Sequence, residues 1–228
     1  MNILLQHPVF SMLLTVIFYM IGMVLHQRWR WIPPIVAACI PIIVALLLIH
    51  EPWAVYNRGG NLFTWMLGPA TVGLAVPMFR NGQALRGSLP RLALIVLIGS
   101  IVGMVTAGGT AWLLGAPGEI IAAAIPKSVT TPIAIEVCRE LKGIPQITIA
   151  MVILAGVLGA SFGPALLRLV GVRDDRSIGA AMGSASHGVG TASLVRHSEF
   201  QASVSSWAMA ASGVFTSMLA ALLALVLR

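Results

Sequence analysis

The sequence predicts an all-α polytopic membrane protein. Of its 228 residues, 58% are hydrophobic and only 9% are charged, whereas a soluble domain carries about 25% charged residues. The mean hydropathy is +0.94. Since one crossing of a bilayer takes about 20 apolar residues, the chain holds about seven or eight transmembrane segments. These segments form a single integral membrane domain over residues 1–228 and leave no length for a soluble domain.

Eight apolar runs account for these segments. The first, fourth, sixth and eighth are ordinary spans, but the third, fifth and seventh contain Gly, Pro, Ser and Thr at mid-membrane depth. In a helix interior proline costs about 3 kcal/mol and glycine about 1 kcal/mol relative to alanine, so we expect two or three discontinuous helices, broken or re-entrant. The runs are residues 9–26, 32–50, 62–79, 91–114, 119–138, 146–167, 178–195 and 203–227.

The interrupted runs share short stretches of sequence. Residues 69–72 resemble residues 126–129, and Gly68–Gly73 resembles Gly183–Gly188. Because each interrupted run follows an ordinary span, this pattern suggests an internal repeat of span plus broken helix, as transporters often contain. Chance similarity between short stretches of small residues is the alternative.

The net charge of +7 does not indicate a nucleic-acid partner. The basic residues are scattered singly between apolar runs instead of clustering on one face, and in a membrane protein such residues report topology. If all eight runs cross and the N-terminus is outside, residues 80–91 and 139–142 face the cytoplasm and residues 168–176 face outside. Cys39 and Cys138 both lie within apolar runs and predict no disulfide.

Lys127 lies inside the fifth run, between Pro126 and Pro132. A charge at the bilayer centre costs about 2.5–3.5 kcal/mol on insertion scales, so its presence favours a function as the cationic anchor for an anionic substrate. The two prolines would break the helix, act as hinges and expose backbone N–H groups that favour anions. The alternative interpretation is a lysine that snorkels to an interface from near a helix end.

Polar side chains follow this lysine closely. Ser128, Thr130 and Thr131 would add hydroxyl donors, and together with the ammonium and free amides they suit a carboxylate. Glu136 is interpreted either as a proton-coupling carboxylate or as an interfacial side chain that pairs with Arg139 three residues later.

His187 lies in the seventh run, beside glycines that allow the backbone to unwind. Because histidine titrates near neutrality, it could donate a hydrogen bond to the substrate or relay a proton. The alternative is a histidine that is hydrogen-bonded to a neighbouring helix. We include its neighbours Gly188, Gly190 and Thr191 in the predicted substrate site.

The third run offers a third wall for this site. Thr71 would contribute a hydroxyl, and Pro69 and Pro77 would break the helix. Close helix packing through small residues is an equally good explanation. The same device explains Gly99 and Gly103, which we interpret as a helix contact and not as part of a site.

The sequence contains no signature of an enzyme. There is no Gly-rich phosphate loop between a strand and a helix, no Cys/His cluster with metal-ligand spacing, and no nucleophile elbow. We therefore expect no catalytic residues, no cofactor and no metal.

Three stretches of the chain, residues 67–77, 126–134 and 187–192, resemble the most characteristic stretches of the CidB/LrgB family. The resemblance covers nearly the whole chain. It implies a multi-pass protein of the bacterial inner membrane and a partner of the small LrgA/CidA type. It also implies one of two functions: a holin- or antiholin-like protein that modulates murein hydrolase export and autolysis, or a carrier of monocarboxylates such as glycolate, glycerate and pyruvate.

The residues favour the carrier, because a holin-like protein does not need discontinuous helices that bear a lysine, hydroxyls and a histidine. In this hypothesis Lys127 pairs with the carboxylate, while His187 and the hydroxyls bind the 2-oxo or 2-hydroxy group. Proton coupling is an additional hypothesis. We expect a homodimer, since a small carrier needs a static scaffold for its moving part. A structural partner for a small membrane protein is the third alternative.

Overall fold

The computed structural model describes residues 8–29, 32, 34–50, 52–73, 75–195 and 197–226, and every regular element in these ranges is a helix. The all-helical class is therefore as the sequence predicts. Within these ranges four helices are long and apolar enough to cross a membrane, which agrees with a multi-pass membrane protein. These are α1 (Pro8–Arg28), α6 (Leu89–Leu113), α9 (Pro145–Leu169) and α11 (Glu199–Val226).

The chain groups into two compact units, Met1–Gly73 and Leu74–Arg228. The first unit contains α1, α2 (Pro34–Ile49) and α3 (Trp53–Gly73), and α1 packs against both of its neighbours. A Cβ atom on Gly22 of α1 would lie only 2.5 Å from the carbonyl oxygen of Pro34. Glycine is thus required there for the close approach of α1 and α2.

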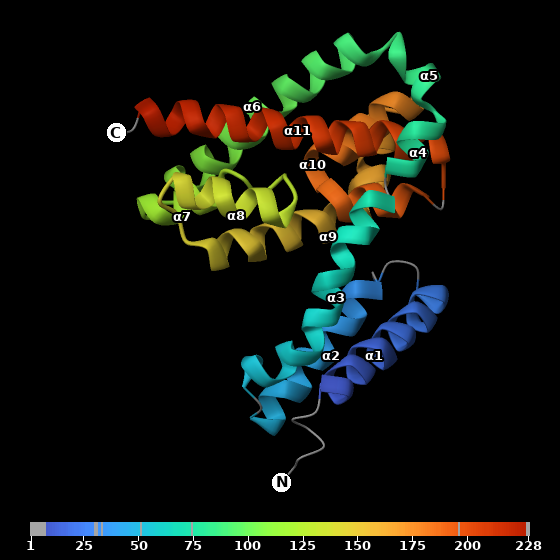
Figure 1. Cartoon of the computed structure of the whole chain (residues 1–228), viewed down its shortest axis with the longest axis vertical. Coiled ribbons are helices and arrows are strands. Elements are labelled where there is room, and N and C mark those ends of the chain that lie inside the picture. The colour runs from blue at the N-terminus through green and yellow to red at the C-terminus, as the bar shows by residue number, and fades with distance from the viewer. Residues whose placement is uncertain are drawn as a thin grey trace. The chain divides into compact units, whose positions relative to one another are not determined.

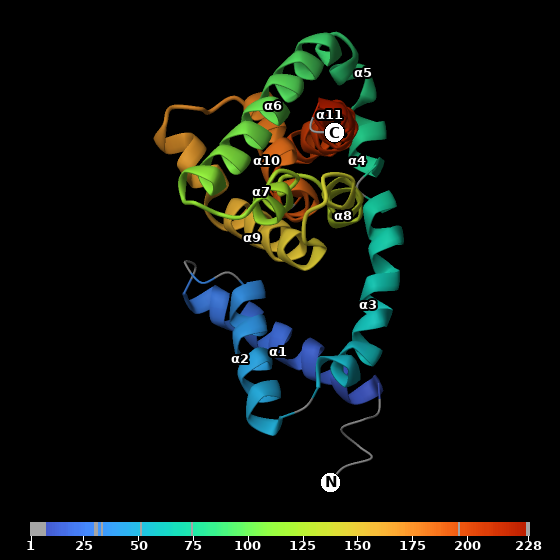
Figure 2. The same cartoon turned by 90° about the vertical axis from the view of Figure 1, so that its left-hand side faces the viewer.

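The second unit is built around α10 (Asp175–Val195), which packs against α6, α9 and α11 (Figure 1 and Figure 2). Its largest core cluster joins α5 (Gly82–Arg86), α6, α10 and α11 through Leu85, Val96, Ala180 and Val204. Its remaining elements are α4 (Ala75–Arg80), α7 (Gly118–Ala124) and α8 (Thr131–Glu140).

α7 and α8 form a hairpin. Helix α7 ends at Ala124, residues 125–130 are not helical, and α8 begins at Thr131. A Cβ atom on Gly143, just beyond α8, would lie 2.7 Å from the backbone nitrogen of Ala123, so the chain returns beside α7. We call residues 125–130 the first tip.

α10 also folds back on itself. His187 has φ 41° and ψ −135°, which are not helical angles, and it separates residues 175–186 from residues 188–195. Leu194 packs with Ile178 and Met182 in one buried cluster. In a continuous helix Ile178 and Leu194 would be about 24 Å apart. The two arms therefore lie side by side, and we call residues 184–188 the second tip.

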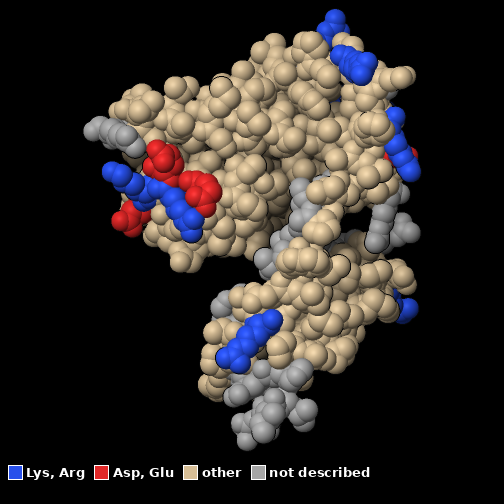
Figure 3. Space-filling view, in the orientation of Figure 1, with Lys and Arg blue, Asp and Glu red and all other residues tan. Residues whose placement is uncertain are grey.

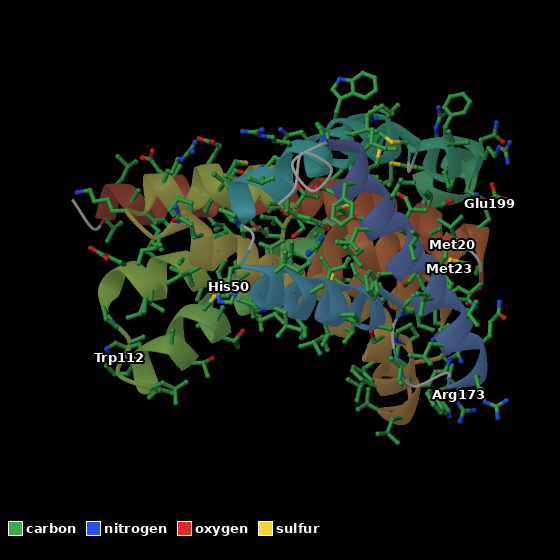
Figure 4. The ribbon with its side chains drawn as sticks, turned by 90° about the horizontal axis from the view of Figure 1, so that it is seen from below. Met20, Met23, His50, Trp112, Arg173 and Glu199 are labelled. Atoms are coloured by element: carbon green, nitrogen blue, oxygen red, sulfur yellow. The ribbon has the colours of Figure 1, made fainter. Side chains whose placement is uncertain are left out.

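These two hairpins enter the second unit from opposite ends. The α10 hairpin starts beside the beginning of α11, where Gln201 Nε2 donates a hydrogen bond of 2.7 Å to Asp175 Oδ1. The end of α4 lies there too, with Arg80 Nη1 3.5 Å from Glu199 Oε1. The α7–α8 hairpin starts and ends at the other end of the unit, where α6 finishes. Arg173 and Glu199 accordingly lie on the opposite side of Figure 4 from Trp112.

This arrangement differs from the topology assumed from the sequence in which loops share one end of the second unit. Residues 80–91 and 168–176 lie at the same end of the second unit, and residues 139–142 lie at the other end, because two of the apolar runs fold back. Figure 3 shows a broad uncharged surface between the charged groups of this unit. Exposed apolar side chains such as Leu94, Ile98 and Val105 of α6 suit contact with lipid.

Candidate functional site

The second unit contains a cavity of about 580 Å³, a volume typical of small-molecule sites. Its long walls are one face of α6 and the first arm of α10, and the first tip reaches its inner end. Its other end opens beside the beginnings of α6 and α10. The lining residues are Ser88, Arg91, Leu92, Ile95, Gly99, Val102, Gly103, Lys127, Ser128, Asp174, Arg176, Ser177, Ala180, Ala181, Ser184 and Ala185.

Polar groups from both tips line the inner end of the cavity. Lys127 Nζ donates a hydrogen bond of 3.2 Å to Ser128 Oγ. A Cβ atom on Gly103 would lie 3.8 Å from Ser128 Oγ, and one on Gly99 would lie 3.9 Å from Ser184 Oγ. The two serine hydroxyls thus face successive turns of α6, whose glycines leave open space beside the Lys127 ammonium.

The two tips meet at one residue of α9. Val129 of the first tip packs against Val152 in a buried cluster, and His187 Nε2 of the second tip donates a hydrogen bond of 2.9 Å to the carbonyl oxygen of Val152. The imidazole is buried and lies against Gly156, where a Cβ atom would be 2.7 Å from Cε1. His187 is therefore bonded to a neighbouring helix and lies outside the cavity lining, close in sequence to Ser184.

The residues that follow His187 hold the second tip in place. Thr191 Oγ1 donates a hydrogen bond of 2.8 Å to the carbonyl oxygen of His187 and shares another of 2.8 Å with Ser205 Oγ on α11. A Cβ atom on Gly190 would lie 2.5 Å from Ser186 Cβ, so glycine permits the arms to approach. Gly188, Gly190 and Thr191 do not line the cavity.

The other predicted residues of the fifth run lie outside the cavity lining. Thr130 occupies the residue before α8, and its carbonyl oxygen accepts a hydrogen bond of 2.9 Å from the Ala134 amide. Thr131 is half-buried at the start of α8, where Pro132 occupies the first turn, a position that tolerates proline. Pro126 is buried in the first tip. Glu136 is exposed and accepts a hydrogen bond of 2.7 Å from Arg139.

Of the residues predicted from the third run, Pro77 belongs to the second unit, and it does not line this cavity. Pro69 lies within α3 of the first unit, and the side chain of Thr71 lies outside the described residues. Pro77 is buried in α4, and its carbonyl oxygen accepts hydrogen bonds of 2.6 Å from Ser203 Oγ and 3.1 Å from Asn81 Nδ2. Pro77 therefore joins α4 to α11.

The sequence did not single out the residues at the mouth of the cavity. Asp174 Oδ2 accepts hydrogen bonds of 2.9 Å from both the backbone nitrogen and the hydroxyl of Ser177. These hydrogen bonds lower the pKa of Asp174 below its usual value. Arg176 lies over the Phe200 ring at 5.8 Å, a cation–π distance. Arg91 also lines the cavity, and the sequence pattern of both arginines indicated only a role in topology.

One signal could have revealed this surface. Ser88, Arg91, Ile95, Gly99 and Gly103 recur every three or four residues and therefore share one face of a helix. That face combines small, polar and basic residues within an otherwise apolar span.

Within the part of the chain that the structure describes, no three His, Cys, Asp or Glu side chains gather to hold a metal ion.

Comparison with known proteins shows one family match, which covers most of the chain. The sequence profile described as "LrgB-like family" matches residues 15–226. The chain is 32% identical over 207 residues to the uncharacterized protein YxaC of Bacillus subtilis, with 90% of each chain covered. It is 30% identical over 221 residues to the holin-like protein CidB of Staphylococcus epidermidis, with 96% of each covered. It is 28% identical over 212 residues to the antiholin-like protein LrgB of Bacillus mycoides, with 92% of each covered. No solved structure matches.

Proposed function

The chain belongs to the LrgB-like family, and we propose that it is a multi-pass membrane carrier for small monocarboxylates of the 2-oxo or 2-hydroxy acid class. The observation that carries this proposal is the ammonium group of Lys127 at the inner end of a cavity of about 580 Å³. A cavity with a cation and hydroxyls at its inner end is suited to a small anion.

The chemistry of this inner end matches such a substrate. The Lys127 ammonium would form a charge-assisted hydrogen bond with the carboxylate. The hydroxyls of Ser128 and Ser184 can both donate and accept, so they would bind either a 2-oxo or a 2-hydroxy group. The glycines of α6 leave room for the ligand on the facing wall.

The two hairpins offer a route for movement of the substrate. In this proposal they are re-entrant segments of the membrane domain, since non-helical backbone at membrane depth is tolerated where protein or a wet cavity surrounds it. α6 with the α7–α8 hairpin and α9 with α10 would form an inverted repeat, an arrangement common in secondary transporters. Pro126 and Pro132 would flank the hinge of the first tip.

Proton coupling would extend this proposal. The candidate group is His187, whose ring lies where the tips meet α9 and donates to the carbonyl oxygen of Val152. Glu136 is a weaker candidate, because it is exposed and paired with Arg139. Assembly as a homodimer, or with a small LrgA/CidA-type membrane protein, also belongs to the proposal.

A second candidate function is a holin- or antiholin-like protein that modulates murein hydrolase export and autolysis. The names of two relatives, holin-like protein CidB and antiholin-like protein LrgB, favour it more directly than they favour a carrier. This function requires no substrate site. The cavity and its lysine are the specific observations that favour the carrier.

Uptake into liposomes tests the carrier. Purified protein should accumulate labelled pyruvate or glycolate, and Lys127→Gln should lower uptake about ten-fold or more, the loss expected for a hydrogen bond to a charged group. Lys142→Gln is the matched control, because Lys142 is the second of the two lysines in the chain and is exposed at a loop. Equal uptake by Lys127→Gln and the parent protein would exclude the role of Lys127.

The same vesicles distinguish the second function. A holin-like protein should release an entrapped dye such as carboxyfluorescein, and the release should be unchanged in Lys127→Gln. Dye release without uptake of either carboxylate would reject the carrier and favour the holin-like function.

A further inference from the structure

The cavity has cationic side chains at both of its ends. Lys127 lies at the inner end, and Arg91 and Arg176 lie at the mouth. Along α6, Arg91 and Gly103 mark the two ends, which are about 18 Å apart at 1.5 Å per residue. The walls between them are formed by apolar or small residues such as Leu92 and Ala181. Asp174 is the acidic residue in this lining and lies at the mouth, so the walls between the mouth and Lys127 contain no carboxylate.

The mouth opens at the end of the second unit that is rich in arginine. Six described arginines lie at this end, against two basic residues, Arg139 and Lys142, at the other. Short loops rich in Lys and Arg face the cytoplasm in inner-membrane proteins, so the mouth opens to the cytoplasm. The six arginines are Arg80, Arg86, Arg91, Arg168, Arg173 and Arg176.

The charges at the mouth do not cancel. Asp174 is the acidic residue in the lining, and its Oδ2 accepts two hydrogen bonds from Ser177. Arg176 lies over Phe200. Arg91 is exposed, and the ion pairs found among the described residues do not include it. The lining of the mouth thus carries two guanidinium groups and one carboxylate, which already accepts two hydrogen bonds.

We propose that Arg91 and Arg176 form a second anion-binding site at the cytoplasmic mouth, which captures a small carboxylate before it moves to Lys127. Guanidinium groups bind carboxylate oxygens in a bidentate manner, and a cleft lined by one sign of charge raises the local concentration of its counter-ion. The choice of a soluble carboxylate rests on the proposed function, whereas the sidedness and the positive potential of the mouth do not.

An anionic lipid headgroup offers the same oxygen chemistry. Ile95 and Val102, which line the cavity, are 56% and 53% exposed, so lipid can approach from the side. The experiment therefore uses vesicles of phosphatidylcholine alone and compares them with vesicles that also contain phosphatidylglycerol.

A cysteine at the mouth reports both the side of the membrane that the mouth faces and the electrostatic potential there. Ser88→Cys is suitable, because Ser88 lines the mouth and its side chain makes no capping hydrogen bond. In a background with Cys39→Ser and Cys138→Ser, the introduced cysteine is treated with the anionic reagent methanethiosulfonate ethylsulfonate and, separately, with its cationic trimethylammonium counterpart. We expect modification only from the cytoplasmic side of oriented vesicles, with the anionic reagent favoured.

Removal of one arginine should change that preference. Arg91→Gln and Arg176→Gln should each lower the anionic-to-cationic rate ratio by roughly three- to ten-fold. Arg173→Gln should leave it unchanged, since Arg173 lies at the same end but outside the cavity lining. Pyruvate should slow modification in phosphatidylcholine vesicles, and this protection should be lost in Arg91→Gln.

Each other result overturns part of the proposal. Modification from the outer side, or a ratio unaffected by both arginine variants, would reject the site. Protection by phosphatidylglycerol but not by pyruvate would reassign it to a lipid headgroup. If the cysteine is modified as expected but no carboxylate is taken up, the proposed function alone is rejected. If a carboxylate is taken up but the arginine variants leave the anionic-to-cationic rate ratio unchanged, the second site alone is rejected.

Discussion

At the scale of single residues, the position of the His187 imidazole depends on the absence of a side chain at position 156. The imidazole donates to the carbonyl oxygen of Val152 and occupies the space beside Gly156. An extra methyl group in a well-packed core typically costs about 1–3 kcal/mol. Gly156 therefore determines whether the second tip can seat against α9.

Gly156→Ala should lower the melting temperature of the purified protein in detergent, measured by tryptophan fluorescence, because the methyl group displaces His187. Gly109→Ala is the matched control: a Cβ atom there meets nothing within 4 Å, and alanine gains up to about 1 kcal/mol in a helix. A melting temperature for Gly156→Ala at or above that of Gly109→Ala would contradict this placement of His187.

Asp174 should make a small, pH-dependent contribution to stability. Its hydrogen bonds from Ser177 lower its pKa in the folded protein, so its contribution is present above the pKa of the unfolded chain and is lost as the pH falls through the lowered value. Asp174→Ala should lower the melting temperature slightly at pH 7. The corresponding loss in the free energy of unfolding is about 0.5 kcal/mol or less, since the residue is exposed.

The comparison of Asp174→Ala with the parent protein should be repeated in acid. Below the lowered pKa the difference in melting temperature should shrink, because the carboxyl group is then protonated in both states. Asp174→Asn keeps a capping oxygen without the charge, so the difference between Asp174→Asn and Asp174→Ala should not vary with pH. A difference that grows in acid would contradict this assignment.

At the scale of elements, the two hairpins determine where the functional groups meet. Each is shorter than a full crossing, and both tips contact Val152 of α9. α6 supplies the facing wall through Gly99 and Gly103. The inner end of the cavity thus depends on two chain reversals and one continuous helix.

The reversal at His187 can be measured directly. Spin labels at Arg173→Cys and His197→Cys flank α10 and should be less than about 20 Å apart in a double electron–electron resonance experiment. A continuous helix of 21 residues would separate them by more than about 30 Å. The control pair, Lys142→Cys with Arg173→Cys, flanks the continuous α9 and should give roughly 40 Å. Equal distances for the two pairs would rule out the hairpin.

At the scale of the whole molecule, the hairpins decide the topology. If the α10 hairpin starts and ends at the arginine-rich end, Arg86 and Arg173 share one side of the membrane and Lys142 lies on the other. The assumption that every apolar run crosses instead pairs Arg86 with Lys142. The two topologies therefore differ in whether Arg86 lies on the same side of the membrane as Arg173 or as Lys142.

Labelling of intact cells with a membrane-impermeant maleimide resolves this difference. In a background without Cys39 and Cys138, Lys142→Cys should react in intact cells. Arg86→Cys and Arg173→Cys should react only after the membrane is opened, because arginine-rich loops stay in the cytoplasm. Each variant removes one positive charge, so the three are matched. Joint labelling of Arg86→Cys and Lys142→Cys would refute the arrangement.

Much of the fold and part of the site could be predicted from the sequence. Most of the apolar runs overlap a single helix, whereas the fifth run contains two helices with a non-helical segment between them. Lys127 and Ser128, which were predicted to bind the substrate, both line the cavity. Thr130 and Thr131 were predicted as hydroxyl donors and Gly188 as a neighbour of His187, and none of the three lines the cavity. Arg91 and Arg176 were missed because an arginine at the end of a span has the same local pattern whether it faces a cavity or bulk water.

The sequence by itself determined that this chain is helical and apolar and that its unusual segments are costly, because composition, proline and a charge within an apolar run act locally. Only the tertiary structure decided that the fifth and seventh runs fold back, that Ser184 and Lys127 line one cavity, and that the mouth of this cavity carries two arginines. These features depend on which helix faces pack together, and contacts between residues far apart in the chain leave no periodic signal in the sequence.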